Sequence, residues 1–83
     1  MKTRVKISGE YKTYDLNRCR AVCELKLREK VIVVHSVTGS LCIAKVVERR
    51  ENSILVREIT KDIVPHQWRI YKGNLFRGVF KIN

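Results

Sequence analysis

The sequence lacks most of the features that identify enzymes and membrane proteins. No apolar run approaches the roughly 20 residues of a membrane-spanning helix, and no apolar segment typical of a signal peptide follows the basic N-terminus. Gly-rich phosphate loops, GxSxG and HExxH motifs are absent, as are paired carboxylates at a useful spacing. We therefore expect a cytoplasmic protein that does not enter the membrane, uses no cofactor and is not an enzyme.

Cysteine, proline and aromatic residues are few. The three cysteines, Cys19, Cys23 and Cys42, are an odd number at no zinc-ligand spacing, so we expect reduced, buried side chains and no metal site. Pro65, the only proline, excludes a central strand position at that residue. The aromatic fraction of 7% is low for a base-stacking surface, which favours contacts to phosphates over contacts to bases.

Acidic residues are scarce relative to basic ones. The chain has 18 Lys and Arg against 8 Asp and Glu, a formal charge of +10 and a pI near 10.0. Basic residues outnumber acidic ones by nine to four in residues 1–30, by four to three in residues 31–60 and by five to one in residues 61–83. Such an imbalance costs stability through self-repulsion and is typical of proteins that bind an anionic partner.

The length and the 45% apolar content predict one small globular domain, residues 1–83, with a thin core. Residues 3–8 alternate between apolar and polar side chains, which predicts a half-buried strand. From Asp15 to about residue 27, apolar side chains recur every three or four residues, which predicts an amphipathic helix. Cys and Val are poor helix formers, so a strand over residues 19–27 stays open as the alternative.

Residues 30–59 contain three segments rich in Val and Ile. Turn residues at 38–40 and 51–52 separate these segments, so we expect three strands that are covered on both faces for part of their length. Residues 66–72 alternate with Trp68 inward, and Gly73-Asn74 predicts a two-residue hairpin turn before a last strand. The expected fold is mainly β (α+β), a small bent β-barrel with one helix in its N-terminal half.

Polar and basic residues stand together at three places in this expected fold. The outward side chains of the first strand form a basic stripe, a second group flanks the turn at residues 51–52, and a third precedes the Gly-Asn turn. Lysine and arginine can contact a strand of phosphates, and an exposed tyrosine can stack on a base. The candidate nucleic-acid-binding residues are Lys2, Arg4, Lys6, Arg49, Arg50, Asn52, Arg69, Tyr71, Lys72 and Asn74.

Two short motifs carry a family resemblance. In the first, Ile32 and Val34 lead to Gly39, then to residues 44–46 (Ala-Lys-Val) and to Asn52. In the second, an apolar strand ends in Tyr-Lys-Gly-Asn at residues 71–74. The order resembles the Sm-like family of small RNA-binding proteins, which have an N-terminal helix followed by five bent strands in an SH3-like barrel.

The resemblance implies that Asn52, Lys72 and Asn74 hold RNA from two adjacent loops. It also implies that the chain can form an oligomer, because members of the family assemble into rings. The sequence departs from the family pattern at Ala44, where a second glycine is usual, and at Ser36, where an apolar residue is usual. No Asp precedes Asn52 at the usual place either, so a generic SH3-like barrel stays open as the alternative.

We interpret the sequence as a basic accessory or regulatory protein that binds RNA or DNA, with RNA favoured, chiefly through phosphates. One alternative is a protein-interaction module that docks on an acidic surface of a larger machine such as RNA polymerase or the ribosome, as a phage-type regulator would. Another is a metal-free endoribonuclease with a histidine as general base. His35 lies in an apolar segment and is expected in the core, and His66 is expected to be exposed and idle, so we assign no catalytic residue.

Overall fold

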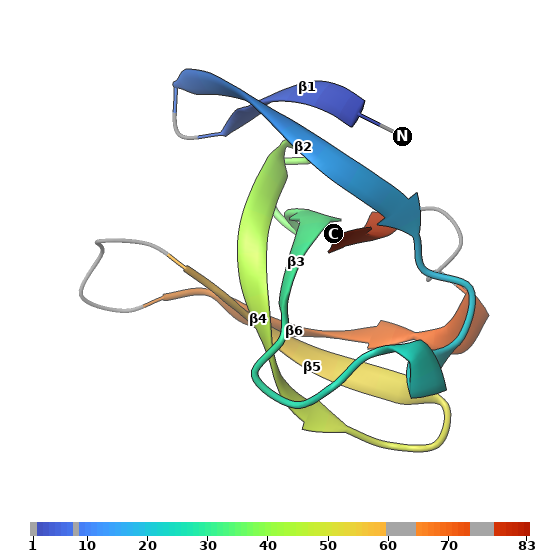
Figure 1. Cartoon of the computed structure of the whole chain (residues 1–83). Helices are drawn as coiled ribbons and strands as arrows, with labels where there is room; N and C mark the ends of the chain where they lie inside the picture. The colour runs from blue at the N-terminus through green and yellow to red at the C-terminus, as the bar shows by residue number, and fades with distance from the viewer. Residues whose placement is uncertain (1, 8, 60–64, 74–77) are drawn as a thin grey trace.

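The computed structural model describes residues 2–7, 9–59, 65–73 and 78–83. Within these ranges the chain forms seven strands in one antiparallel sheet, so the expected mainly β class is confirmed. The order of strands across the sheet is β1-β2-β7-β3-β4-β5-β6 (Figure 1). The elements are β1 (Lys2–Ile7), β2 (Glu10–Arg18), the short 3-10 turn η1 (Val22–Glu24), β3 (Lys30–Val34), β4 (Leu41–Arg49), β5 (Ser53–Glu58), β6 (Gln67–Tyr71) and β7 (Val79–Ile82).

The first strand follows the alternation in the sequence. Val5 is buried and Thr3 and Ile7 are half-buried, whereas the lysines and the arginine between them are exposed. A tight turn with Gly9 at a φ of 81° joins β1 to β2, and the two strands pair from Ile7 with Glu10 to Lys2 with Asp15. Glycine adopts positive φ without the steric cost that other residues meet, which accounts for its place in this turn.

The helix predicted from residue 15 to residue 27 is not formed. β2 continues to Arg18, because β7 supplies a backbone partner along its last residues, with Leu16 opposite Ile82. The apolar repeat arises from two separate environments: Leu16 lies in one core cluster, and Cys19 and Val22 lie in another. The alternative strand over residues 19–27 is wrong as well. Within the described ranges, no helix is long and apolar enough to span a membrane.

Glu24 holds the short turn that replaces the helix. Its carboxylate accepts hydrogen bonds from the backbone N–H groups of Arg20, at 2.7 Å, and Ala21, at 3.3 Å. The bond from the Arg20 N–H also lowers the pKa of this carboxyl below its ordinary value. Lys81 on β7 donates to the Glu24 carbonyl oxygen at 2.8 Å, so the backbone of η1 is tied to the sheet while the Glu24 side chain closes the turn itself.

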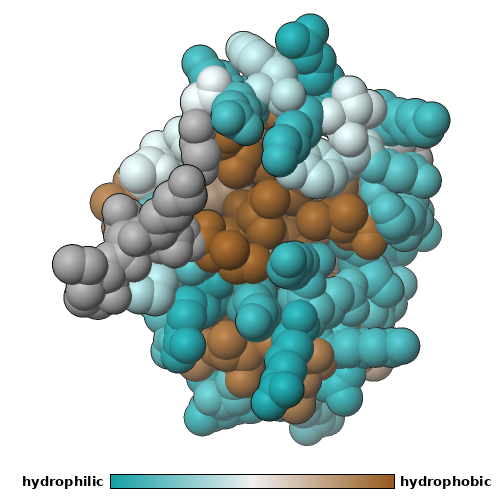
Figure 2. Space-filling view, turned by 60° about the vertical axis from the view of Figure 1, so that its left-hand side comes forward, coloured by the Kyte–Doolittle hydropathy of each residue, from teal (hydrophilic) through white to brown (hydrophobic). Residues whose placement is uncertain are grey.

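Two apolar clusters lie on opposite faces of β3. Val31 and Val33 belong to the main core, which β4 to β7 and the η1 segment complete, whereas Ile32 belongs to a second core under the β1–β2 hairpin. The hairpin crosses the outside of β3, β4 and β7 (Figure 1), so β3 is covered on both faces, as expected. On one side of the molecule, Figure 2 shows a band of apolar surface with hydrophilic side chains above and below it. Each fully buried Val or Ile contributes about 1.5–3 kcal/mol.

The expected strands from residue 30 to residue 59 are all present as β3, β4 and β5. The turn between β3 and β4 has Gly39 at a φ of 72°, and the backbone between β4 and β5 closes through a bond from the Arg50 N–H to the Ser53 carbonyl oxygen. A register shift between Val46 and Glu48 interrupts the pairing of β4 with β5. Irregularities of this kind bend a strand and increase its local twist.

The hairpin predicted at Gly73-Asn74 does not form between the last two strands. β6 pairs with β5, whereas β7 inserts between β2 and β3. Gly73 does not adopt the positive φ that a two-residue hairpin turn requires, and Asn74 lies outside the described residues. β6 is therefore an edge of the sheet, and a closed barrel is not formed by the described strands.

Candidate nucleic-acid interface

Nine of the ten candidate residues lie in the described ranges, and the structure divides them into two groups. Lys2, Arg4 and Lys6 lie on β1, and the other six surround the β4–β5 turn and the end of β6. Figure 1 places β1 at one end of the molecule and the β4–β5 turn at the other. The tenth residue, Asn74, lies outside the described residues. The candidate residues therefore do not form one continuous site.

The cations of β1 form the expected stripe along one exposed face. The guanidinium carbon of Arg4 lies 4.6 Å from the centroid of the Tyr11 ring, and the Lys6 Nζ lies 5.6 Å from it. Tyr11 is the cross-strand partner of Lys6 and is 58% exposed. Cation–π contacts of this kind are worth about 0.5–1 kcal/mol at exposed sites and leave the positive charge available to an anion.

The arginines around the β4–β5 turn are engaged by other groups of the protein. Arg50 Nε lies 2.6 Å and Arg69 Nη2 lies 3.1 Å from Glu48 Oε1, and Arg69 Nη1 donates to the Ser53 hydroxyl at 2.9 Å. Arg49 Nη1 donates to the Leu25 carbonyl oxygen at 2.5 Å. The bonds from Arg69 and then Arg50 hold the pKa of Glu48 below its ordinary value. Arg69 thus joins β6 to β4 and β5, whereas Arg49 joins β4 to the segment that follows η1.

Asn52 and Lys72 lie side by side. The Lys72 backbone N–H donates to the Asn52 carbonyl oxygen at 2.8 Å, and both residues are exposed. Tyr71, the residue before Lys72, is 60% exposed. Asn52 and Lys72 are thus adjacent, although they are 20 residues apart in the sequence.

A third group of cations, which we call the central basic row, was not among the candidates. Lys30 on β3 is the direct cross-strand partner of Lys45 on β4, and Lys45 is the partner of Arg57 on β5. Lys30 and Arg57 are exposed and Lys45 is half-buried. Directly opposed side chains have Cβ atoms about 4.5–5.5 Å apart, so the three charges stand close together across three strands.

The central basic row has no acidic partner in the part of the chain that the structure describes. The hydrogen bond from Arg57 Nε to the Gln67 side-chain oxygen, at 3.1 Å, joins a cation to a neutral group. Like charges directly opposite each other destabilise a sheet. The row was missed because its members are 12 to 27 residues apart in the sequence and meet only through the strand register.

The cysteines follow the expectation at two of three positions. Cys19 and Cys42 are buried and all three thiols are free, but Cys23 is exposed on η1. Burial raises the pKa of Cys42 to about 11, so this thiol is neutral and a poor metal ligand near neutral pH. No group of three or more His, Cys, Asp and Glu side chains that could hold a metal ion occurs among the described residues.

The two histidines lie together against Trp68. The side chain of His35 is 11% exposed and its Nε2 lies 3.0 Å from Glu58 Oε2. Its Nδ1 accepts hydrogen bonds from two backbone N–H groups of the β3–β4 turn, so the proton resides on Nε2 and points to Glu58. His35 is a bonded, mostly buried residue as expected. His66, expected to be exposed, is half-buried instead, and its Nε2 lies 2.8 Å from the Ser36 hydroxyl.

The described residues therefore contain the predicted basic stripe on β1, an arginine cluster and the unpredicted central basic row. The arginine cluster consists of Arg49, Arg50 and Arg69, which bond to other groups of the protein. Comparison of the chain with protein-family models, curated proteins and solved structures finds no match, so the resemblance to the Sm-like proteins stays a prediction.

Proposed function

We propose that the protein is a small cytoplasmic accessory or regulatory factor that binds nucleic acid, RNA in preference to DNA, through phosphate contacts. The observation that carries the proposal is the central basic row. Lys30, Lys45 and Arg57 repel one another in the free protein and have no acidic partner within the described ranges. A phosphate backbone that crosses the row removes this repulsion and releases condensed counterions, and both effects favour binding.

The β1 stripe supplies a second surface of the same kind. Its three cations are exposed, and the Tyr11 ring restrains two of them without neutralising them. Lys2 also faces Asp15 across the hairpin, so its contribution is smaller than that of Arg4 or Lys6. The preference for RNA rests on the adjacent Asn52 and Lys72 and on the resemblance to Sm-like proteins.

We also propose that the sheet curls into a partly open barrel of the SH3-like or Sm-like kind. The return of β7 to the side of β3 supports this, because it brings the end of the chain back to the start of the β3–β6 meander. The main core supports it as well, since residues from β3, β4, β5, β6 and β7 all contribute to one cluster.

The proposal is tested by binding to labelled single-stranded RNA, single-stranded DNA and duplex DNA over a range of salt concentrations. Replacement of Lys30, Lys45 and Arg57 together by Gln removes three phosphate contacts. For a single strand, each contact contributes about 0.7 to the slope of log K against log salt. The triple variant is expected to bind more weakly, with a slope less steep by about 2.

A matched control removes the same number of charges from the region around the β4–β5 turn. Replacement of Arg49, Arg50 and Lys72 by Gln lowers the net charge equally, but Lys72 alone among these side chains has no described bonding partner. We expect the slope to change by about 0.7 in this variant. Equal losses in the two variants would show that net charge alone drives binding and would overturn the assignment to the central basic row. Salt-independent binding, or none, combined with recovery of one stoichiometric protein partner after nuclease treatment, would favour docking on an acidic protein surface.

A further inference from the structure

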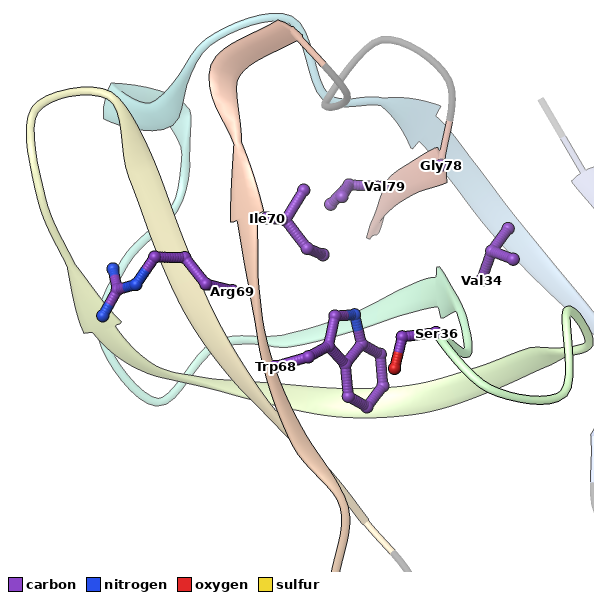
Figure 3. Close-up of a pocket in the computed structure, with 7 residues that line it drawn as sticks. All are labelled: Val34, Ser36, Trp68, Arg69, Ile70, Gly78 and Val79. Carbon is purple, nitrogen blue, oxygen red and sulfur yellow. The ribbon is translucent and has the colours of Figure 1, made fainter.

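A hollow of about 400 Å³ lies between the edge strand β6 and the start of β7, two strands that do not pair with each other. We call this gap in the sheet the open seam. Figure 3 shows side chains from three segments around it. Its wall is mostly apolar, and its volume falls within the range of about 300–1,000 Å³ that is usual for small-molecule sites. The side chains that line it are Val34, Ser36, Trp68, Ile70 and Val79, together with the backbone of Gly78.

Arg69 also borders the hollow, but through its backbone. Figure 3 shows its side chain pointing away, toward the bonds with Glu48 and Ser53 described above. At the two ends of β6, the Lys72 backbone N–H donates to the Asn52 carbonyl oxygen and the Glu58 backbone N–H donates to the His66 carbonyl oxygen. The even-numbered residues of β6 therefore direct their N–H and C=O groups to β5. In an antiparallel pair these directions alternate. The N–H and C=O of Arg69 therefore point out of the sheet edge, and neither has a partner among the described residues.

Two side chains add polar groups to the same wall. The indole N–H of Trp68 has no acceptor among the described residues, and Figure 3 shows the indole nitrogen on the side of the ring that faces Ile70 and Val79. The hydroxyl of Ser36 lies beside this ring and is held by His66 at 2.8 Å. The hollow thus combines apolar side chains with a few convergent donors and acceptors, the usual composition of a ligand site.

The Trp68 ring is held in place by two other rings. The ring centroids of Trp68 and His66 are 5.3 Å apart, those of Trp68 and His35 are 5.0 Å apart, and the two histidine rings are stacked at 4.9 Å. His35 is in turn bonded to Glu58. A ring that is packed in this way loses little further freedom when a ligand binds, so the site is pre-organised.

We propose that this hollow binds one unpaired nucleobase of the strand whose phosphates contact the basic surfaces. A nucleobase is flat and apolar on its faces and carries adjacent donors and acceptors on its edge, which match the N–H and C=O of Arg69 and the indole N–H. A phenyl or aliphatic ligand would leave those backbone groups unpartnered, at a cost. The inference rests on the proposed function, but it concerns a site that phosphate binding does not need.

Trp68 is the only tryptophan in the chain, so tryptophan fluorescence reports on the surroundings of this one ring, which lines the hollow. Uridine and adenosine carry no phosphate and test the site without the basic surfaces. At millimolar concentrations one or both are expected to change the Trp68 emission saturably and to shift the indole N–H signal in NMR spectra, whereas inorganic phosphate is not. No response to either nucleoside would overturn the proposal.

Two pairs of variants locate the binding. Gly78→Leu fills the hollow from its rim, and the added Cβ meets Val34 only at an ordinary contact distance of 3.7 Å. Gly73→Leu is the matched control, because nothing lies within 4 Å of a Cβ added there. Ser36→Ala removes one hydroxyl and is expected to weaken nucleoside binding about fivefold. Ser40→Ala, in the same turn but outside this hollow, is its control and is expected to bind as the unaltered protein does.

The outcomes separate this inference from the proposed function. Weaker nucleoside binding in Gly78→Leu and Ser36→Ala, with unchanged binding in both controls, supports the base site. Equal effects of all four variants would overturn it. Salt-dependent oligonucleotide binding that persists when no nucleoside responds would leave the proposed function standing and remove the base site. Loss of both kinds of binding in the unaltered protein would contradict the proposed function too.

Discussion

The central basic row and the arginine cluster at the β4–β5 turn (Arg49, Arg50 and Arg69) have similar charge and different bonding partners. In the cluster, Glu48 accepts bonds from Arg50 and Arg69, and the bond from Arg69 joins β6 to β4. In the row, Lys30, Lys45 and Arg57 face one another across three strands, and none of them forms an ion pair with a described acidic residue. The difference teaches that the number of basic residues does not distinguish the two regions, whereas the presence or absence of an acidic partner does, and the proposed binding surface is chosen on that ground.

One irregularity in β4 produces much of this difference. The register shift between Val46 and Glu48 places Glu48 opposite Leu55, and Leu55 is itself opposite Arg69 on β6. Glu48 and Arg69 therefore flank the same residue of β5 and can bond across it. With regular pairing, Val47 would occupy that position and Arg69 would lack its acid.

The largest expected effect comes from giving the row the acid it lacks. Lys45→Glu places a carboxylate between Lys30 and Arg57, so attractive cross-strand pairs replace repulsive ones. We expect nucleic-acid affinity to fall about tenfold at physiological salt and the melting temperature to rise. Binding assays and thermal denaturation measure the two effects, and a fall in both affinity and stability would contradict the account of the row.

Truncation of the cluster arginines is expected to affect stability. Arg69 is 20% exposed at its side chain and bonds to the buried Ser53 and to Glu48, so Arg69→Ala should cost about 1–2 kcal/mol of unfolding free energy. Arg50 is 66% exposed, and Arg50→Ala should cost about 0.5 kcal/mol or less. Urea denaturation of both variants checks the order. Equal costs would mean that Arg69 does not brace the strands.

Removal of the acid from the cluster is expected to make it resemble the row. Glu48→Gln frees the guanidinium groups of Arg50 and Arg69 from their shared partner. Nucleic-acid affinity should then rise and the melting temperature should fall, both modestly, because Glu48 is partly exposed. Affinity that stays the same while stability falls would show that this end of the molecule lies outside the nucleic-acid surface.

The smallest expected effect is a dependence of stability on pH. The folded protein holds the pKa of Glu48 below its ordinary value of 4.5, chiefly through the bond from Arg69. A carboxyl whose pKa is lower in the folded protein than in the unfolded chain stabilises the folded state at pH values above the unfolded-state pKa. This contribution is lost as the pH falls through the folded-state pKa. The difference in melting temperature between the unaltered protein and Glu48→Gln should therefore be present near pH 6 and shrink below about pH 4.5. A constant difference across this range would exclude ionisation as its source.

The strands were predictable wherever a pattern lay within one segment. The alternation in β1, the Val- and Ile-rich β3, β4 and β5, and the turn at Gly39 all appear as expected, because side-chain alternation and positive φ are local properties. The helix failed because Leu16 and Cys19 share a helical spacing but are buried in different clusters. Spacing alone cannot tell whether two apolar residues lie in the same core.

The sequence predicted the chemical type of the candidate residues but not the groups to which they bond in the folded protein. The sequence indicates which side chains are basic and which lie outward on a strand, and the β1 stripe follows from that alone. It does not indicate that Arg69 bonds to Glu48, since 21 residues separate them. Nor does it place Trp68 beside Ser36 and Gly78 around one hollow, because those residues come from three segments.

The amino-acid sequence by itself determined that the chain is β-rich, strongly basic and marked by local turns. The tertiary structure decided the insertion of β7 between β2 and β3, the shift in β4, the central basic row and the hollow at the open seam. The physical reason is that backbone hydrogen bonds pair strands almost without regard to side chains. The register is selected by burial summed over distant segments, which exists only once the chain has folded.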